Sequence, residues 1–220
     1  MDTDEAVVVV TGFGPFRQYL DNPSWKAAQG LKLVGLGEDV KVVIRELPVA
    51  YNRAHQVIVD LWKTLNPKFA IHLGIATGCR GILLEQTGKN HGYSDRDVCG
   101  SCPVNQNCID GGPAKLDSIV DMRALSKQLK KAGKDITYSR DAGRAVFIHV
   151  PASGSLSSPD RLVPLLQIII QTLLLQKVDS CSPSYSFLST SSSPSSTITC
   201  SSSSSSFSSQ INENTGTVLQ

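Results

Sequence analysis

Runs of β-branched residues that alternate with helical patterns limit this chain to one class of fold. Residues 6–11, AVVVVT, form a continuous apolar run that is typical of a strand buried on both faces. The turn-forming stretch GFGPF stops this strand, and Asn22 followed by Pro23 marks the start of a helix. Further strands are predicted at 40–49, 69–75 and 81–86, with helices at 51–65 and 114–133. The alternation predicts an α/β fold with helices on both faces of a sheet.

Two further strands, ITYS and AVFIHV, precede a predicted helix over about residues 158–177. Beyond that helix the composition changes, because serine dominates residues 180–209. Such a segment buries too little apolar surface to offset its ordering entropy. We therefore expect an α/β domain over residues 1–177 and a disordered Ser-rich tail over residues 178–220.

Charge and hydropathy exclude several classes of partner. The net charge is +2 and no basic block stands out, so nothing electrostatic favours nucleic acid. The first residues, MDTDEA, lack the positive flank and apolar core of a signal peptide. The most apolar stretch, LVPLLQIIIQTLLL, is too short to span a bilayer. We expect a cytosolic protein that does not bind membranes and whose six cysteines are free thiols.

The GFGPF stretch is a poor nucleotide fingerprint, because it has no third glycine at the required offset and no Lys-Ser/Thr pair. Its two aromatic residues, Phe13 and Phe16, leave a strand end, where ligand clefts of α/β sheets form. The rings could line such a cleft, or they could simply cap the core. We expect no bound cofactor.

A cluster of thiols in a polar loop offers a second candidate site. Cys99 and Cys102 are two residues apart, with Cys108 and His91 nearby. The spacing matches no common zinc module, and there is no second Cys-x2-Cys. Reduced loop thiols are the simpler interpretation, and we expect no metal site.

Glu85 and His149 each stand at the end of an apolar strand, where side chains often point into a cleft. Together they could form the carboxylate–imidazole pair of a hydrolytic triad. Glu85 could instead be a surface residue at a strand exit, and a single histidine in an apolar strand is more often a satisfied structural residue than a catalyst. A triad would still need a serine or cysteine nucleophile.

Six motifs occur in order along residues 6–177: TGFGPF, NPSW, LGIATGCRGILLEQ, GGPA, SRDAGR and FIHVP. Together they resemble the pyroglutamyl-peptidase I family of cytosolic cysteine omega-peptidases. The resemblance implies a three-layer α/β/α fold of the phosphorylase/hydrolase type, with a central twisted mixed sheet. It also implies that peptides with an N-terminal pyroglutamate are the partners and that a Glu–Cys–His triad removes this residue.

Carried over to matching positions, the resemblance assigns the catalytic carboxylate to Glu85 and the catalytic histidine to His149. The two phenylalanines of the family's substrate pocket match Phe13 and Phe16. An apolar pocket suits pyroglutamate, because this residue is a neutral lactam without a free amine.

The family's nucleophile has no counterpart here. In the family, the segment after the position of Arg144 continues into an aromatic-rich helix that begins near the catalytic cysteine. In this chain SRDAGR runs directly into AVFIHVP. Without a thiolate the acyl-enzyme route is closed. A substitute thiol would have to reach the histidine at about 3 Å in the right orientation, which we do not expect of Cys79, Cys99, Cys102 or Cys108.

The sequence therefore predicts a pyroglutamyl-peptidase-like protein that is inactive as it stands. Two alternatives remain open. The chain could be a pseudoenzyme that binds pyroglutamyl N-termini, or a poorly folded splice product from which the nucleophile segment was skipped.

The short connector also constrains the sheet. Parallel neighbouring strands need a crossover of about a dozen residues, and Asp141–Arg144 supply only four. If ITYS and AVFIHV run parallel in the family, we expect this chain to break one strand, to pair the two as a hairpin or to leave one unpaired.

Overall fold

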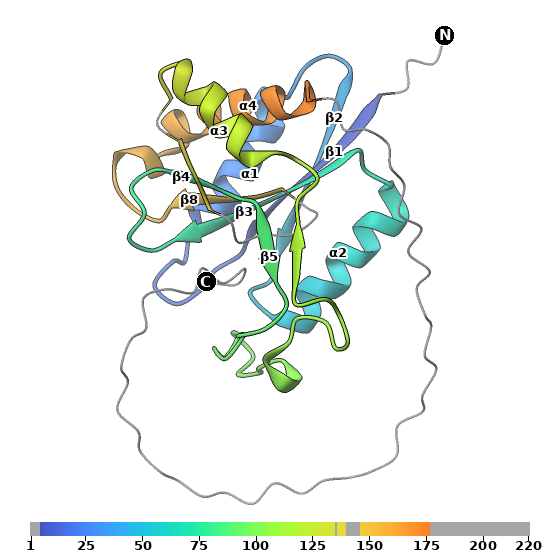
Figure 1. Cartoon of the computed structure of the whole chain (residues 1–220). Coiled ribbons are helices and arrows are strands. Elements are labelled where there is room, and N and C mark those ends of the chain that lie inside the picture. Colours follow the sequence, from blue (N-terminus) through green and yellow to red (C-terminus); the bar gives the residue numbers. More distant parts are fainter. Residues whose placement is uncertain (1–4, 135, 140–145, 177–220) are drawn as a thin grey trace, which may run out of the picture.

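The computed structural model describes residues 5–134, 136–139 and 146–176 (Figure 1). The connector Asp141–Arg144 and the Ser-rich tail 178–220 lie outside these residues. The elements follow in this order: β1 (Ala6–Phe13), α1 (Pro23–Val34), β2 (Val40–Leu47), α2 (Tyr51–Leu65), β3 (Phe69–Ala76), β4 (Ile82–Glu85), β5 (Thr87–Lys89), β6 (Lys115–Asp117), α3 (Met122–Lys131), β7 (Ile136–Ser139), β8 (Val146–Pro151) and α4 (Pro159–Leu174).

Six of the strands form one mixed sheet in the order β2-β1-β3-β8-β4-β7. Strands β1, β2, β3 and β8 run parallel to one another. Strand β4 is antiparallel to β8 and parallel to β7, the edge strand. The predicted mixed α/β sheet is therefore confirmed.

Side-chain alternation divides this sheet between two helical layers. In β1, Val8 and Val10 belong to the main core, which also contains residues of α1, α3 and α4. The intervening Val9 packs instead with Leu61 of α2 and Ala70 of β3. Successive residues of a strand point to opposite faces, so α2 covers the face opposite to the other three helices. Figure 1 shows α1, α3 and α4 together on one side of the sheet and α2 on the other.

The start of α1 is fixed by local contacts, as the sequence predicts. The Asn22 side chain accepts a hydrogen bond from the backbone N–H of Ser24, and Pro23 occupies the first helical position. The amide nitrogen of Asn22 also donates to the Gly14 carbonyl at 3.0 Å. This bond ties the GFGPF turn to the N-terminus of α1, and so positions the end of β1.

The helix predicted over 114–133 begins later than expected. Lys115–Asp117 instead form β6, which pairs antiparallel with β5 in a separate two-stranded ribbon. Leu116 and Ile119, assigned to the apolar face of that helix, are exposed. Helix α3 starts only after Asp121, whose carboxylate accepts from the Ala124 N–H at 2.8 Å. The N-cap therefore overrides the apolar spacing.

The arrangement of strands β7 and β8, which follow each other along the chain, was not predicted from the sequence. Both pair with β4, which lies between them, and they run antiparallel to each other. Ser139 and Phe147 each pair with Glu85, one on either side. Strands are spaced by about 4.8 Å, so these two residues lie about 10 Å apart. The expectation of a broken strand, a hairpin or an unpaired strand assumed that the two strands run parallel in the family; in this chain they are antiparallel, and each pairs with β4.

Candidate active site

The structure brings Glu85 and His149 together on one face of the sheet. In the antiparallel β4–β8 pair, Leu83 lies opposite His149 and Glu85 lies opposite Phe147. Glu85 and His149 are thus diagonal neighbours, close enough for long side chains to meet. Oε1 of Glu85 lies 3.2 Å from Nε2 of His149, and each side chain is only 5% exposed.

The second polar atom of each partner has no hydrogen-bond partner in the part of the chain that the structure describes. Oε2 of Glu85 and Nδ1 of His149 are both buried without a hydrogen-bond partner. With Nε2–H donating to the carboxylate, Nδ1 carries the imidazole lone pair. The pair is therefore arranged as a carboxylate-held imidazole whose second nitrogen meets no donor among the described residues.

No thiol of the described residues donates to this nitrogen. The Cys79 Sγ donates to the Gly81 carbonyl at 3.3 Å, and Cys102 Sγ donates to the Ser94 carbonyl at 3.3 Å. Cys99 and Cys108 are exposed. Within the described part of the chain, no group of three histidine, cysteine, aspartate or glutamate side chains could hold a metal ion.

The predicted aromatic residues stand beside this pair. Phe13 is buried and Phe16 is half-buried, and both pack with Leu47, Val49 and Phe147. The Phe147 ring lies 4.8 Å from the His149 imidazole, with the two planes at 61°. The phenylalanine cluster of Phe13, Phe16 and Phe147 thus forms an apolar wall that reaches the imidazole.

Phe147 is a site residue that the sequence analysis missed. Its only signal was its place two residues before His149, which puts both side chains on the same face of β8. Its ring occupies the space above Gly74 on the neighbouring strand. A Cβ at Gly74 would lie 2.6 Å from Cζ of Phe147, so only glycine permits this approach.

Phe13 also lines a cavity of about 250 Å³. Its walls come from the GFGPF turn, the first turns of α1 and the end of β2, and include Trp25, Lys26 and Glu46. The mixed polar lining differs from the apolar wall that faces His149.

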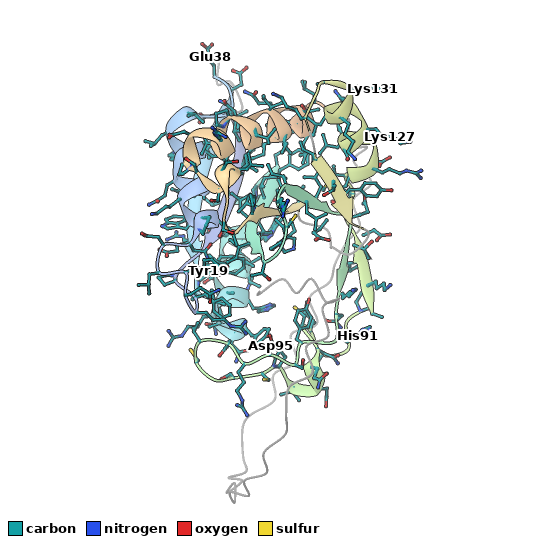
Figure 2. All side chains as sticks on the ribbon, turned by 90° about the vertical axis from the view of Figure 1, so that its left-hand side faces the viewer. Tyr19, Glu38, His91, Asp95, Lys127 and Lys131 are labelled. Atoms are coloured by element: carbon teal, nitrogen blue, oxygen red, sulfur yellow. The ribbon has the colours of Figure 1, made fainter. Side chains whose placement is uncertain are left out.

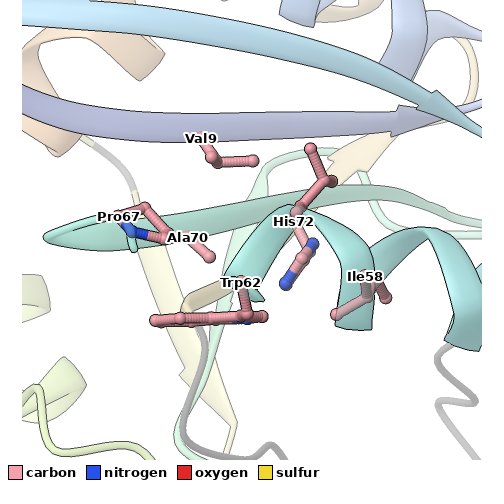
Figure 3. A pocket seen from close by; sticks show the side chains of 7 residues that line it. Val9, Ile58, Trp62, Pro67, Ala70 and His72 are labelled. Atoms are coloured by element: carbon pink, nitrogen blue, oxygen red, sulfur yellow. The ribbon is translucent and has the colours of Figure 1, made fainter. Parts of the chain in front are cut away.

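A second buried histidine lies outside the predicted site. Nδ1 of His72, on β3, is 2.8 Å from Oγ1 of Thr11. Its ring lies between the sheet and α2, next to Ile58 and Trp62 (Figure 3). The surrounding side chains leave no room for a water molecule. Burial lowers the pKa of His72 to about 4, so this ring is neutral and structural.

A mixed α/β sheet with a buried carboxylate–imidazole pair beside an apolar wall has the layout of a hydrolase. A family model described as pyroglutamyl peptidase matches residues 6–160. This chain belongs to the pyroglutamyl peptidase family, as its motifs predict.

Individual relatives agree with this assignment. Pyroglutamyl-peptidase 1 of Homo sapiens is 36% identical over 193 residues, covering 79% of this chain and 92% of the relative. The pyroglutamyl-peptidase 1-like protein of Homo sapiens is 35% identical, covering 66% of this chain and 83% of the relative. The crystal structure of pyroglutamyl peptidase I from Bacillus amyloliquefaciens has the same fold, with a TM-score of 0.69 at 24% identity over 78% of this chain and 96% of that one.

The alignment with human pyroglutamyl-peptidase 1 has more positions than the number of residues that this chain contributes to it. Since 79% of 220 residues is about 174, about 19 of its 193 positions fall opposite gaps in this chain. Among the described residues, no helix is both long enough and apolar enough to cross a membrane.

Proposed function

We propose that this chain binds peptides that begin with pyroglutamate but does not hydrolyse them. Membership of the family supports the ligand class, because its relatives are named as pyroglutamyl peptidases. The phenylalanine cluster supports binding, since a neutral lactam favours an apolar surface.

One observation supports the loss of turnover: His149 Nδ1 is buried and has no hydrogen-bond partner among the described residues, while Nε2 lies 3.2 Å from Oε1 of Glu85. An unpartnered buried polar atom costs about 1–3 kcal/mol. A proton donor facing this nitrogen would satisfy it, as a thiol does for the base of a cysteine peptidase. The gaps in the alignment with the human relative agree with a lost segment.

The consequence for the chemistry is direct. In acyl transfer to a thiol, the base takes the thiol proton and the thiolate attacks the carbonyl carbon. The C–N bond then breaks, and the imidazolium returns its proton to the leaving amine. Here Glu85 can hold His149 in place, but none of the described residues supplies a donor for the first proton transfer. Binding remains, and turnover does not.

Hydrolysis of a pyroglutamyl–aminocoumarin substrate tests the chemical half of this proposal. We expect coumarin release at the uncatalysed rate, both before and after treatment with a thiol alkylator. Release above background that the alkylator abolishes would contradict the proposal, because one of the six cysteines would then serve as nucleophile.

Thermal unfolding with peptide tests the binding half. Pyroglutamyl-alanine amide is expected to raise the Tm, whereas prolyl-alanine amide, whose ring nitrogen is charged, is not. Phe16→Ala, at a half-buried position, should weaken the shift while leaving the unfolding transition cooperative. A cooperative transition that no peptide shifts would rule out binding, and a non-cooperative one would favour the poorly folded product.

A further inference from the structure

Arg17 occupies a turn that its residue type does not favour. Phe16 and Tyr19 form a backbone bridge, with N–H to carbonyl distances of 3.0 and 2.9 Å, so Arg17 and Gln18 make the tight turn between them. Arg17 has a φ of 50°, in the left-handed region that favours glycine. Strain of this kind often marks a side chain that is retained for its function.

The Arg17 guanidinium lies over the apolar wall. Its Cζ is 4.7 Å from the centroid of the Phe16 ring. Its ion pair to Asp95, at 3.5 Å, is long, and both side chains are about half exposed, at 55% and 47%. Such a pair contributes little, so another anion can replace Asp95.

The loop that carries Asp95 is held in place by other contacts. Tyr51 at the start of α2 donates its hydroxyl to the Asp95 carbonyl at 3.0 Å, and its N–H to the Asp97 carboxylate at 3.1 Å. The Val98 N–H donates to the carbonyl of Val49, which packs with the phenylalanine cluster. Figure 2 shows Tyr19 and Asp95 at one end of the molecule, away from Glu38 and Lys127. The loop and the turn therefore border the same apolar wall.

We propose that Arg17 makes this chain prefer pyroglutamyl peptides that carry a negative charge directly after the pyroglutamate, either an acidic side chain or the free carboxylate of a dipeptide. This inference rests on the proposed function, since it assumes that the pyroglutamyl ring contacts Phe16. Any ligand on that ring lies within about 10 Å of the guanidinium, which is a Debye length at ordinary ionic strength.

Calorimetric titration with matched peptides tests the preference. The peptides are pyroglutamyl-X-alanine amides with alanine, glutamate or lysine at X, together with pyroglutamyl-alanine as a free acid. We expect the glutamate and free-acid peptides to bind about 2–5-fold more tightly than the alanine peptide, and lysine to bind more weakly. In 0.5 M salt the differences should shrink.

Three variants separate this role from a structural one. Arg17→Glu should invert the order of the glutamate and lysine peptides, whereas Lys127→Glu, an equal change of charge on α3, should leave it unchanged. Arg17→Gly should abolish the preference while the Tm stays the same or rises, because glycine relieves the strained turn. If Arg17 were retained only for folding, Arg17→Gly would lower the Tm instead.

The failures are distinguishable. If all four peptides bind with equal affinity, the assignment of Arg17 is wrong and the proposed function stands. If the preference persists in Arg17→Glu, another group reads the charge. If no peptide binds the unmodified chain, both proposals fail together.

Discussion

At the scale of single residues, Gly74 on β3 leaves the space that the Phe147 ring of β8 occupies. The absence of a Cβ lets the Phe147 ring lie over β3 and reach the His149 imidazole. Gly74 therefore allows the phenylalanine cluster to contact the His149 imidazole.

We predict that Gly74→Ala destabilises the protein by about 1–3 kcal/mol, because the new methyl group overlaps the Phe147 ring in a buried cluster. Urea unfolding measures the loss. Phe147→Leu removes the end of the ring that the methyl group would meet, so the double variant should cost less than the sum of the two single changes. Strict additivity would contradict the overlap.

His72 makes the stability depend on pH. Burial holds its pKa at about 4 in the folded chain, whereas an unfolded chain protonates histidine near pH 6.5. Between pH 6.5 and pH 4 the unfolded state therefore binds a proton that the folded state does not, and the free energy of unfolding falls as the pH is lowered through this range. Above pH 7 the effect vanishes. The linkage predicts a loss of about 2 kcal/mol between pH 7.5 and pH 5.

Chemical denaturation at several pH values checks this component by comparison with His72→Gln. Glutamine retains a polar group beside Thr11 but does not titrate, so the variant should lose less stability over the same interval. Equal losses in the two proteins would assign the pH dependence to other groups.

At the scale of elements, α2 depends on a distant residue. Its own N-cap residue, Ala50, has no side chain that accepts a hydrogen bond, and Asp97 takes over this role from the long loop. Partial burial acts to raise the pKa of Asp97, but hydrogen bonds from the N–H groups of Ser101, Tyr51 and Cys99 outweigh it and lower the pKa. The carboxylate thus joins the loop to α2 in its charged form.

We predict that Asp97→Ala costs about 1 kcal/mol, the usual value of an N-cap, and that Asp97→Asn costs less. Hydrogen exchange should accelerate in the first turn of α2 and in residues 97–101. Asp121→Ala removes the local cap of α3 and serves as the matched comparison, with acceleration confined to that helix. Unchanged exchange in α2 would show that Asp97 does not anchor it.

Sequence separation explains which elements could be predicted. The start of α1 was correct because Asn22, Pro23 and Ser24 are consecutive and their contacts are local. The β5–β6 ribbon joins segments about 30 residues apart, and the Asp97 cap spans 46, as its hydrogen bond to Tyr51 records. No local pattern carries such information.

The candidate site follows the same rule. The positions of Glu85 and His149 at strand ends made them candidates, and the family motifs assigned them roles. Their contact depends on β4 running antiparallel beside β8. The residues of either strand alone do not predict this pairing. Phe147 joins the site through its place on the same face of β8 as His149 and through the space left by Gly74 on β3.

At the scale of the whole molecule, the described core is complete before the Ser-rich tail begins. Helix α4 contributes Leu162, Leu166 and Leu173 to the main core, all fully buried. We propose that the α/β domain ends near residue 177.

A chain that stops at residue 177 should therefore unfold cooperatively, with a Tm within about 2 °C of the full chain, since a change of 1 kcal/mol shifts the Tm of a domain of this size by only 2–4 °C. Calorimetry of the two chains makes the comparison. A much lower Tm would mean that the tail stabilises the domain.

The places of Ser139 and Phe147 on either side of Glu85 have a consequence for inheritance. The last residue of β7 and the start of β8 lie at the same end of the sheet, only two strand spacings apart. The stretch between them can therefore lengthen or shorten without any change in strand order. A single insertion or deletion there can add or remove a chemical group while every strand pairing is passed on intact. The strand order and the length of the segment between β7 and β8 can therefore change independently of each other.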